Sequence, residues 1–204
     1  MNKNLPLSNI VVLDLTNVLS GPFATQILSD LGAEIIKVEK PNGDDSRKFG
    51  PFIKKRSSYF ISLNRGKKSI VVDFNNEEDK KIFKKLLAIS DVIIDNFKPG
   101  TLEKYGFSSS YLKKNFPLLI QTKISGFGET GPLKENPAYD MIVQAMGGIM
   151  SITGKDKNET YRVGSSIGDI VAGLYAVIGV LTQIIFRNQS KKGSRLDLSM
   201  LDCQ

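Results

Sequence analysis

The stretch "IVVLDLTNVLSGPFATQILSDLGAEIIKVE", residues 10–39, predicts a β-α-β unit. Its first part, Ile10–Leu15, is a short apolar run rich in branched residues, as expected for a buried strand. A helix follows, because Pro22 suits a first helical turn and Gly32 can close the helix. The run Glu34–Glu39 predicts the second strand. The helix face that we expect to be buried comprises Phe23, Ile27, Leu28 and Leu31.

The same alternation of strand and helix continues along the chain. Ser69–Phe74 predicts a strand, and a helix from about Asn76 is acidic at its start and basic later, which suits the helix dipole. Further strands are predicted at Asp91–Asn96 and Leu118–Ser125, and "LDLSMLDCQ", residues 196–204, indicates a strand running into a new helix. We therefore expect an α/β fold with a largely parallel sheet and helices on both faces. The apolar face of the helix from Asn76 comprises Ile82, Phe83, Leu86 and Leu87.

The composition limits the chemistry that the chain can perform. Its 204 residues, 41% hydrophobic and 24% charged, are typical of a soluble globular protein with one sizeable core or part of a larger domain. Histidine is absent, so the chain cannot build a histidine triad, a histidine metal site or an imidazole base. The single cysteine, Cys203, can neither hold zinc alone nor form an internal disulfide, which agrees with a reducing cytoplasm.

The net charge of +7 favours anionic partners, but its distribution is diffuse. No block of lysines forms a nucleic-acid arm, and we expect most lysine pairs to lie on a solvated surface. The apolar run Ile170–Phe186 is at the short limit for a membrane span, so we predict a buried helix there. The first ten residues lack the apolar core of a signal peptide, and we expect a cytoplasmic protein. The lysine pairs are Lys54 and Lys55, Lys67 and Lys68, Lys80 and Lys81, Lys84 and Lys85, Lys113 and Lys114, and Lys191 and Lys192.

The segment "SGFGETGP", residues 125–132, carries three glycines at the G-x-G-x-x-G spacing of dinucleotide-binding proteins. That fingerprint requires a helix to open at the third glycine, so that its amino-terminal end meets the pyrophosphate. Here Pro132 follows at once, and a second proline comes five residues later. We interpret the segment as a mobile glycine loop at the carboxyl edge of the sheet rather than an NAD site.

Polar residues follow the predicted strands at their carboxyl ends. Asn17–Ser20 comes after the first strand, Lys40 after the second, and Asn96–Lys98 after a later one. Open α/β sheets bind ligands at this edge. The alternative is that these are ordinary turn residues, because Asn, Gly and Pro are common in any loop.

An aspartate lies in the first turn of the long apolar helix predicted in "VGSSIGDIVAGLYAVIG", residues 163–179. If Ser166 caps the helix, Asp169 takes the third helical position, as in a capping box worth about 1 kcal/mol. The same position favours an ionised carboxylate, and Gly164 and Gly168 leave room for a ligand. A carboxylate attacks an activated acyl group without a base, and therefore needs no histidine. Residue chemistry alone leaves both interpretations open.

Several segments together resemble the class III CoA-transferase family, also called the CaiB/BaiF family. Members of that family are considerably longer. The resemblance therefore implies that residues 1–204 form the amino-terminal part of a CoA-binding, Rossmann-like large domain, without the small domain and the carboxyl-terminal return. The segments are "VLDLTNVLSGPFATQILSDLGAEIIKVEKPNGDDSR", "SSYFISLNRGKKSIVVDF", "DVIIDNFKPGTLEKYGF", "SGFGETGP", "YDMIVQAMGGIMSITG", "VGSSIGDIVAGLYAVIG" and "GSRLDLSMLD".

The resemblance implies a catalytic role for Asp169 as the nucleophile that takes the acyl group from an acyl-CoA and later passes CoA to a carboxylic acid. CoA is then a substrate and carrier, with no permanently bound cofactor and no metal. Tyr139 and the Gly126–Gly131 loop are expected to line the reacting centre. An interlocked homodimer is implied, with no nucleic-acid or membrane partner. The implied CoA-binding positions are Leu19, Ser20, Lys40, Val72, Asp73, Phe74, Asn75, Asn96, Phe97, Lys98, Lys104, Tyr139 and Asp140.

Two departures from the family pattern bear on this assignment. Lys40 and Lys104 stand where relatives often carry arginine, so each keeps the charge for a CoA phosphate and loses the two-pronged geometry. The related α-methylacyl-CoA racemases pair an aspartate with a histidine in a "G-H-D" segment, whereas residues 138–140 read "AYD". A racemase needs a second base, so the transferase is favoured. The remaining alternatives are a CoA-binding fragment without turnover and a basic nucleic-acid-binding domain, which the scattered lysines disfavour.

Overall fold

Six parallel strands form the central sheet of the computed structural model, which describes residues 5–156 and 158–204. The strands lie in the order β10-β7-β6-β1-β2-β5, and every neighbouring pair is parallel. The predicted α/β fold with a largely parallel sheet is therefore confirmed. The strands are β1 (Val11–Asp14), β2 (Glu34–Glu39), β5 (Lys68–Val71), β6 (Val92–Asp95), β7 (Ile120–Ser125) and β10 (Arg195–Ser199).

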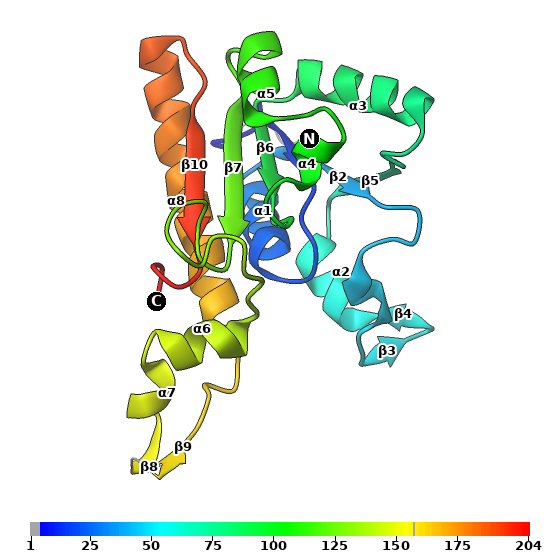
Figure 1. The fold of residues 1–204 in the computed structure, drawn as a ribbon. Helices are drawn as coiled ribbons and strands as arrows, with labels where there is room; N and C mark the ends of the chain where they lie inside the picture. Colours follow the sequence, from blue (N-terminus) through cyan, green and yellow to red (C-terminus); the bar gives the residue numbers. More distant parts are fainter. Residues whose placement is uncertain (1–4, 157) are drawn as a thin grey trace.

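Helices cover both faces of the sheet (Figure 1). Successive side chains of a strand point to opposite faces, so Val12 joins one hydrophobic core and Leu13 the other. The core around Val12 includes side chains of α1 and α8, and the core around Leu13 includes side chains of α3, α4 and α5. These helices are α1 (Ser20–Asp30), α3 (Glu77–Ile89), α4 (Thr101–Lys104), α5 (Ser109–Asn115) and α8 (Ile167–Ser190).

The strand order creates a switch point between β1 and β6. From β1 the chain builds outward through β2 to β5, and it then crosses back so that β6 pairs with the other side of β1. The chain that leaves β1 therefore continues into a helix on one face of the sheet, and the chain that leaves β6 continues into a helix on the other. Ligands of open α/β sheets bind in the crevice at such a point.

Two extensions project beyond this carboxyl edge (Figure 1). One carries two short helices and a small hairpin, and the other carries a hairpin followed by a helix. The first comprises α6 (Asp140–Met146), α7 (Ile149–Ile152), β8 (Gly154–Asp156) and β9 (Glu159–Thr160). The second comprises the 3₁₀ helix η1 (Asp45–Lys48), β3 (Phe52–Ile53), β4 (Arg56–Ser57) and α2 (Ser58–Asn64).

Three local predictions were wrong. The strand predicted to reach Phe74 ends at Val71, because the Phe74 ring leaves the sheet and stacks on Tyr105. Ile82 is exposed, because the buried stripe of α3 is narrow and centred on Phe83. The helix predicted after the last strand is a turn over residues 200–203.

The long helix α8 buries only one of its faces, whereas a buried helix was predicted. Within the described parts of the chain, it alone is long and apolar enough to span a membrane, judged by length and composition. Its inner face, including Ala172, Ala176 and Val180, packs into the core. Its outer face is apolar but exposed, at Leu174, Tyr175, Ile178, Ile185 and Phe186.

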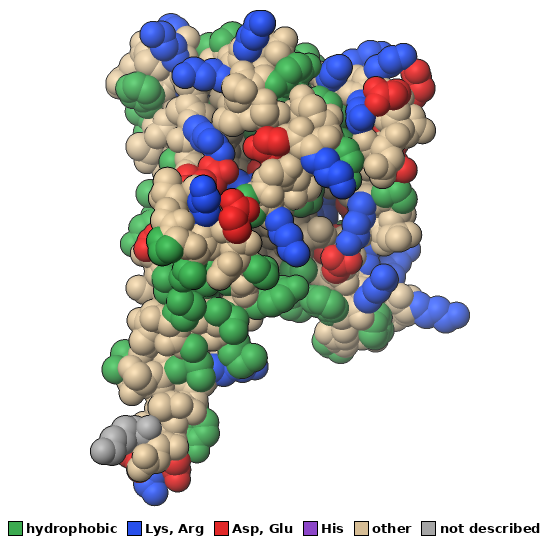
Figure 2. Space-filling model, viewed as in Figure 1, with side chains coloured by type: hydrophobic (Ala, Val, Ile, Leu, Met, Phe, Trp, Pro, Cys, Tyr) green, Lys and Arg blue, Asp and Glu red, His purple; other side chains and the backbone are tan. Residues whose placement is uncertain are grey.

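Lys67 is an exception to the expectation that most lysine pairs lie on the solvated surface. Its side chain is 1% exposed, and its ammonium lies 3.0 Å from a carboxylate oxygen of the fully buried Asp14. An ion pair with a buried carboxylate is what allows a lysine to be enclosed. Other lysines and arginines are spread over the visible face rather than gathered in one block (Figure 2).

Candidate active site

Asp169 occupies the third position of α8, as predicted, and faces the first turn of α1. The two helices approach closely one turn further along. A Cβ atom at Gly173 would lie 2.8 Å from the backbone oxygen of Ser20 and 3.0 Å from the Phe23 ring. Since α1 begins at Ser20, this contact holds the amino-terminal end of α1 against Gly173, which lies one helical turn after Asp169.

The Asp169 carboxyl group is half-buried and lines a cavity of about 270 Å³ at the switch point. Burial, followed by the negative charge of Asp140, raises the pKa of Asp169 to about 6, while hydrogen bonds from the Ser20 hydroxyl and backbone N–H oppose the rise. The group is therefore ionised at neutral pH and more basic than an ordinary aspartate. Other residues around this cavity include Asn17, Ser20, Asn96, Phe97, Lys98 and Tyr139.

Asp169 does not act in a capping box, because the cap of α8 comes from another helix. The Ser166 side chain makes no capping hydrogen bond in the part of the chain that the structure describes. Instead Asp140 of α6 accepts a hydrogen bond of 2.9 Å from the Gly168 N–H group. The alternative that explained Asp169 as a local cap is therefore wrong, and the Asp169 carboxylate is left beside the cavity.

A second cavity, of about 160 Å³, lies between the ends of β1, β2 and β5. Asn17 and Phe97 line both cavities, so the two adjoin. The walls of the second cavity combine aromatic rings with the side chains of Lys37 and Lys40, and the Lys40 ammonium lies 2.7 Å from a carboxylate oxygen of Asp45. The predicted residues Lys40, Val72, Phe74 and Phe97 all lie here, together with Thr101 and Tyr105.

Five predicted residues line neither of these two cavities in the described structure. Leu19 precedes α1, and its carbonyl accepts a hydrogen bond from Phe23. Asp73 and Asn75 form a turn, in which the Asp73 carboxylate accepts from the Asn75 N–H at 2.9 Å. The exposed Lys104 places its ammonium 5.8 Å from the centre of the Tyr105 ring, at the rim of the second cavity. Asp140 is 7% exposed and lies behind Asp169.

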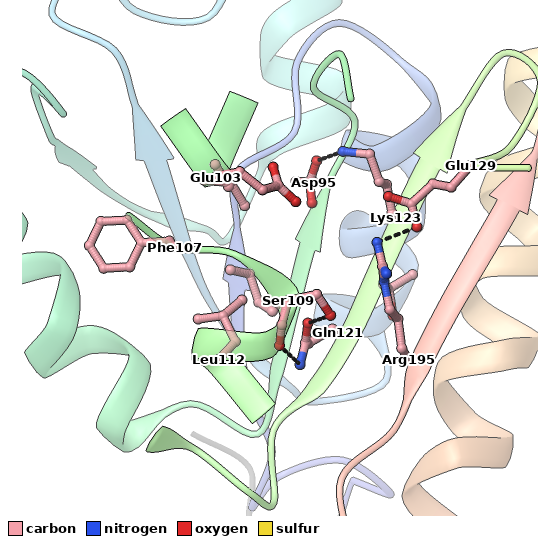
Figure 3. A pocket seen from close by; sticks show the side chains of 12 residues that line it. Asp95, Glu103, Phe107, Ser109, Leu112, Gln121, Lys123, Glu129 and Arg195 are labelled. Atoms are coloured by element: carbon pink, nitrogen blue, oxygen red, sulfur yellow. Dashed lines mark hydrogen bonds and ion pairs between the residues drawn. The ribbon is translucent and has the colours of Figure 1, made fainter. Parts of the chain in front are cut away.

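The loop after β6 is fixed from both sides. The Asn96 side chain accepts a hydrogen bond from the Asn17 N–H and donates one to the Asn17 carbonyl, each 2.9 Å long. Asp95 accepts hydrogen bonds from the Lys123 ammonium at 2.8 Å and from the Phe97 N–H at 3.1 Å. Figure 3 shows the Asp95–Lys123 pair beside a much smaller cavity of about 30 Å³. These bonds hold Phe97 where the two larger cavities adjoin.

Sequence reasoning missed a buried ion pair beneath the loop after β1. The Lys37 ammonium donates to the Thr16 carbonyl at 2.7 Å and lies 2.9 Å from an oxygen of Asp44. The other oxygen of Asp44 accepts a hydrogen bond of 3.3 Å from Val18, whose φ is 67°. The signal was available, because a lysine interrupts the otherwise apolar strand "IIKV".

Only part of the Gly126–Gly131 loop lies where it was expected. Gly126 lines the cavity of Asp169, and no helix opens after the third glycine, as predicted. A Cβ at Gly128 would lie 3.5 Å from Asp197, because the loop folds back towards β10. The hydrogen bond from the Glu129 N–H to Asp197, 2.8 Å long, holds it there.

Comparisons with known proteins agree with one another. The family model described as "CoA-transferase family III" matches residues 7–204. An acetyl-CoA:oxalate CoA-transferase from Acetobacter aceti is 45% identical over 97% of this chain and 51% of that protein. A succinyl-CoA:glutarate CoA-transferase from Homo sapiens is 41% identical over 100% of this chain and 47% of that protein.

A solved structure is similar over the same region. A CAIB/BAIF family protein from Brucella suis superposes with a TM-score of 0.95 at 43% identity. The match covers 98% of this chain and 55% of that one. The chain thus spans about half the length of the relatives that it matches.

Proposed function

The chain belongs to CoA-transferase family III, and from this premise we propose that it is the amino-terminal part of an enzyme that transfers CoA from an acyl-CoA to a carboxylic acid. The observation that carries the proposal is the Asp169 carboxylate, half-buried beside a cavity that adjoins a second one at the switch point. The rest of the large domain and a small domain would follow in the complete protein. Small dicarboxylates are the first acceptors to test, because relatives are named for oxalate and glutarate.

The proposed chemistry uses Asp169 alone as the nucleophile. Its carboxylate oxygen bonds to the thioester carbonyl carbon, and the C–S bond breaks to release CoA thiolate and leave a mixed anhydride. The thiolate then attacks the Asp169 carbonyl, which releases the donor acid and leaves an aspartyl-CoA thioester. The acceptor carboxylate then attacks the aspartyl-CoA thioester, which releases CoA thiolate and forms a second anhydride. The thiolate attacks the acceptor's carbonyl carbon in this anhydride, yielding the new acyl-CoA and free Asp169. No step needs a histidine.

We propose that CoA lies across both cavities. The nucleotide end would occupy the cavity of Phe74, Tyr105 and Lys40, where rings can stack on adenine and an ammonium can meet a phosphate. The thiol end would pass Phe97 towards Asp169. Ser20 would keep a donor beside the reacting carboxyl, and Tyr139, 80% exposed, would face the acyl group from the rim.

Trapping the covalent intermediate tests this function directly. The full-length protein is incubated with acetyl-CoA or succinyl-CoA and then with hydroxylamine, and its peptides are analysed by mass spectrometry. We expect a hydroxamate at Asp169, because hydroxylamine cleaves both the anhydride and the thioester. A fragment that only binds CoA retains CoA affinity and yields no hydroxamate. Absence of the adduct with every donor would leave the CoA-binding alternative.

The close contact at Gly173 gives a second expectation. Gly173→Ala places a methyl group against the Ser20 backbone, which moves α1 away from Asp169. We expect kcat to fall about tenfold, since small misplacements of reacting groups are costly. The matched control is Gly179→Ala in the same helix, where the new methyl meets the end of the Leu196 side chain, which can turn aside. Equal losses of kcat in both variants would show that the α1 contact does not position Asp169.

We further propose a cytoplasmic homodimer. One cysteine in 204 residues suits a reducing compartment, and the exposed apolar face of α8 requires a cover in water. Neither nucleic acid nor membrane is needed as a partner for the proposed reaction. A racemase remains disfavoured, because Tyr139 stands where that reaction requires a second base.

A further inference from the structure

Two buried side chains of α6 hold the segment that leads into α8. Asp140 accepts hydrogen bonds from the Gly168 N–H at 2.9 Å and from the Gln144 side-chain amide at 2.7 Å. The Gln144 oxygen accepts a hydrogen bond of 2.8 Å from the Val163 N–H. Asp140 is 7% exposed and Gln144 0% exposed. The residues bonded, 163 and 168, are the two ends of the segment immediately before Asp169.

The donor and the acceptor of each of these three hydrogen bonds are fixed. Both ends meet backbone N–H groups, which can only donate, so Asp140 and Gln144 must each present an oxygen to them. The amide nitrogen of Gln144 then points at the remaining oxygen of Asp140, which must accept. An ionised Asp140 satisfies all three bonds. An asparagine at residue 140 that accepts from Gly168 would place its amide nitrogen against the amide nitrogen of Gln144. Rotating the Gln144 amide by half a turn would relieve that clash, but it would place the Gln144 nitrogen against the Val163 N–H group.

Asp140 also places a negative charge behind the proposed nucleophile. Like charges favour the protonated form of a carboxyl group, so Asp140 makes Asp169 more basic. Ser20 of α1 opposes this through its hydrogen bonds. The other groups that face Asp169 are Tyr59 of α2, whose own pKa rises to about 12 through burial and then the charge of Asp169, and the cavity residues Asp45, Lys98, Glu135 and Tyr139.

We propose that Asp140, oriented by Gln144, is a positioning residue that fixes the approach of Asp169 to the cavity and raises its nucleophilicity. The inference rests on the proposed function, in which Asp169 is the nucleophile. It requires no contact between Asp140 and the substrate. It separates Asp140 from the CoA-binding residues with which the family resemblance groups it.

The test compares Asp140→Asn with the double variant Asp140→Asn/Gln144→Glu in the full-length protein. In the double variant the new amide nitrogen at residue 140 donates to the new carboxylate at residue 144 in place of the lost bond. The other oxygen of that carboxylate accepts from the Val163 N–H. Every hydrogen bond is restored, while the negative charge moves one side chain further from Asp169. The readouts are kcat, KM for acyl-CoA, the melting temperature and the pH dependence of kcat/KM.

For Asp140→Asn we expect kcat to fall about tenfold with KM nearly unchanged, and the acid limb of kcat/KM to move down by about one pH unit. In the double variant the melting temperature should return to the wild-type value, while the acid limb of kcat/KM stays at a lower pH than in the wild type. A single variant that loses only stability, with an unmoved acid limb, would overturn the inference. So would an increase in KM alone, which would make Asp140 a CoA contact.

A measurement that does not depend on turnover separates this inference from the proposed function. Titration of ¹³C-labelled aspartate carboxyl groups by NMR reports the pKa of Asp169, whose signal is assigned by its loss in Asp169→Asn. If the wild type transfers no CoA but Asp140→Asn still lowers the pKa of Asp169, the proposed function fails and the electrostatic role of Asp140 stands. If the pKa of Asp169 does not change, the inference fails even in an active enzyme.

Discussion

Asp169→Asn is expected to reduce CoA transfer by a factor of at least ~10³, because an amide cannot form the anhydride on which every later step depends. The substitution keeps the shape of the side chain, and its one amide oxygen can still accept a hydrogen bond from Ser20. The affinity for acyl-CoA should therefore change little, and the loss should lie in kcat. The measurement is initial-rate transfer between succinyl-CoA and a dicarboxylate, together with CoA binding by calorimetry.

The same variant should be at least as stable as the wild type. The pKa of Asp169 is raised to about 6, so the folded state binds its proton more tightly than the unfolded state does. At neutral pH the ionised group therefore opposes folding, by on the order of 2 kcal/mol. Asparagine removes that cost, and the gain in the free energy of unfolding should disappear below about pH 4, where aspartate is protonated in both states.

The pH dependence of the wild type follows from the same group. The reacting form is the carboxylate, so kcat/KM should fall as pH decreases through about 6. The matched control for Asp169→Asn is Asp202→Asn, which removes an exposed carboxylate near the end of the described chain. We expect the Asp202→Asn variant to transfer CoA at the wild-type rate. Undiminished transfer by Asp169→Asn, or equal losses in both variants, would contradict a nucleophilic Asp169.

The sequence predicted the parts of the fold that depend on local patterns. Branched apolar runs marked β1, β2, β6 and β7, and the alternation with helices predicted a parallel sheet. Asp169 was placed correctly at the third position of α8, because glycines and a serine mark the start of that helix. The extension of β3, β4 and α2 was missed, since its short elements bury little and show no clear periodicity.

The interactions that orient the site could not be predicted, because they join residues far apart in the sequence. Asp140 caps a helix that begins 27 residues later, and nothing local distinguishes it from a cap of its own helix. Lys67 and Lys68 are adjacent and chemically identical, yet one is enclosed and the other is 63% exposed. Only the packing of α1 against β1 and of α2 against α1 decides which lysine meets Asp14.

Lys67→Met is expected to cost ~3–5 kcal/mol of the free energy of unfolding, the range seen when one partner of a buried ion pair is removed. The Lys67 ammonium lies 3.0 Å from Asp14 and donates to Thr25 at 2.8 Å and to Asn64 at 2.9 Å. It therefore ties β1, α1 and α2 together beneath the loop that leads to Ser20. Methionine fills similar space and leaves Asp14 charged, buried and without its cation. Chemical denaturation at neutral pH measures the loss.

The pH dependence distinguishes a lost ion pair from lost packing. Burial alone would raise the pKa of Asp14, but Lys67, then Lys37, and hydrogen bonds from two threonines hold it well below its usual value. In the wild type this stabilisation is present above about pH 4 and is lost as pH falls below it. Without Lys67 the pKa of Asp14 rises, so the variant's deficit should shrink as the solution is acidified. A deficit that stays constant with pH would indicate packing alone. Lys68→Met is the matched control, because its exposed pair with Glu34 contributes less than ~1 kcal/mol.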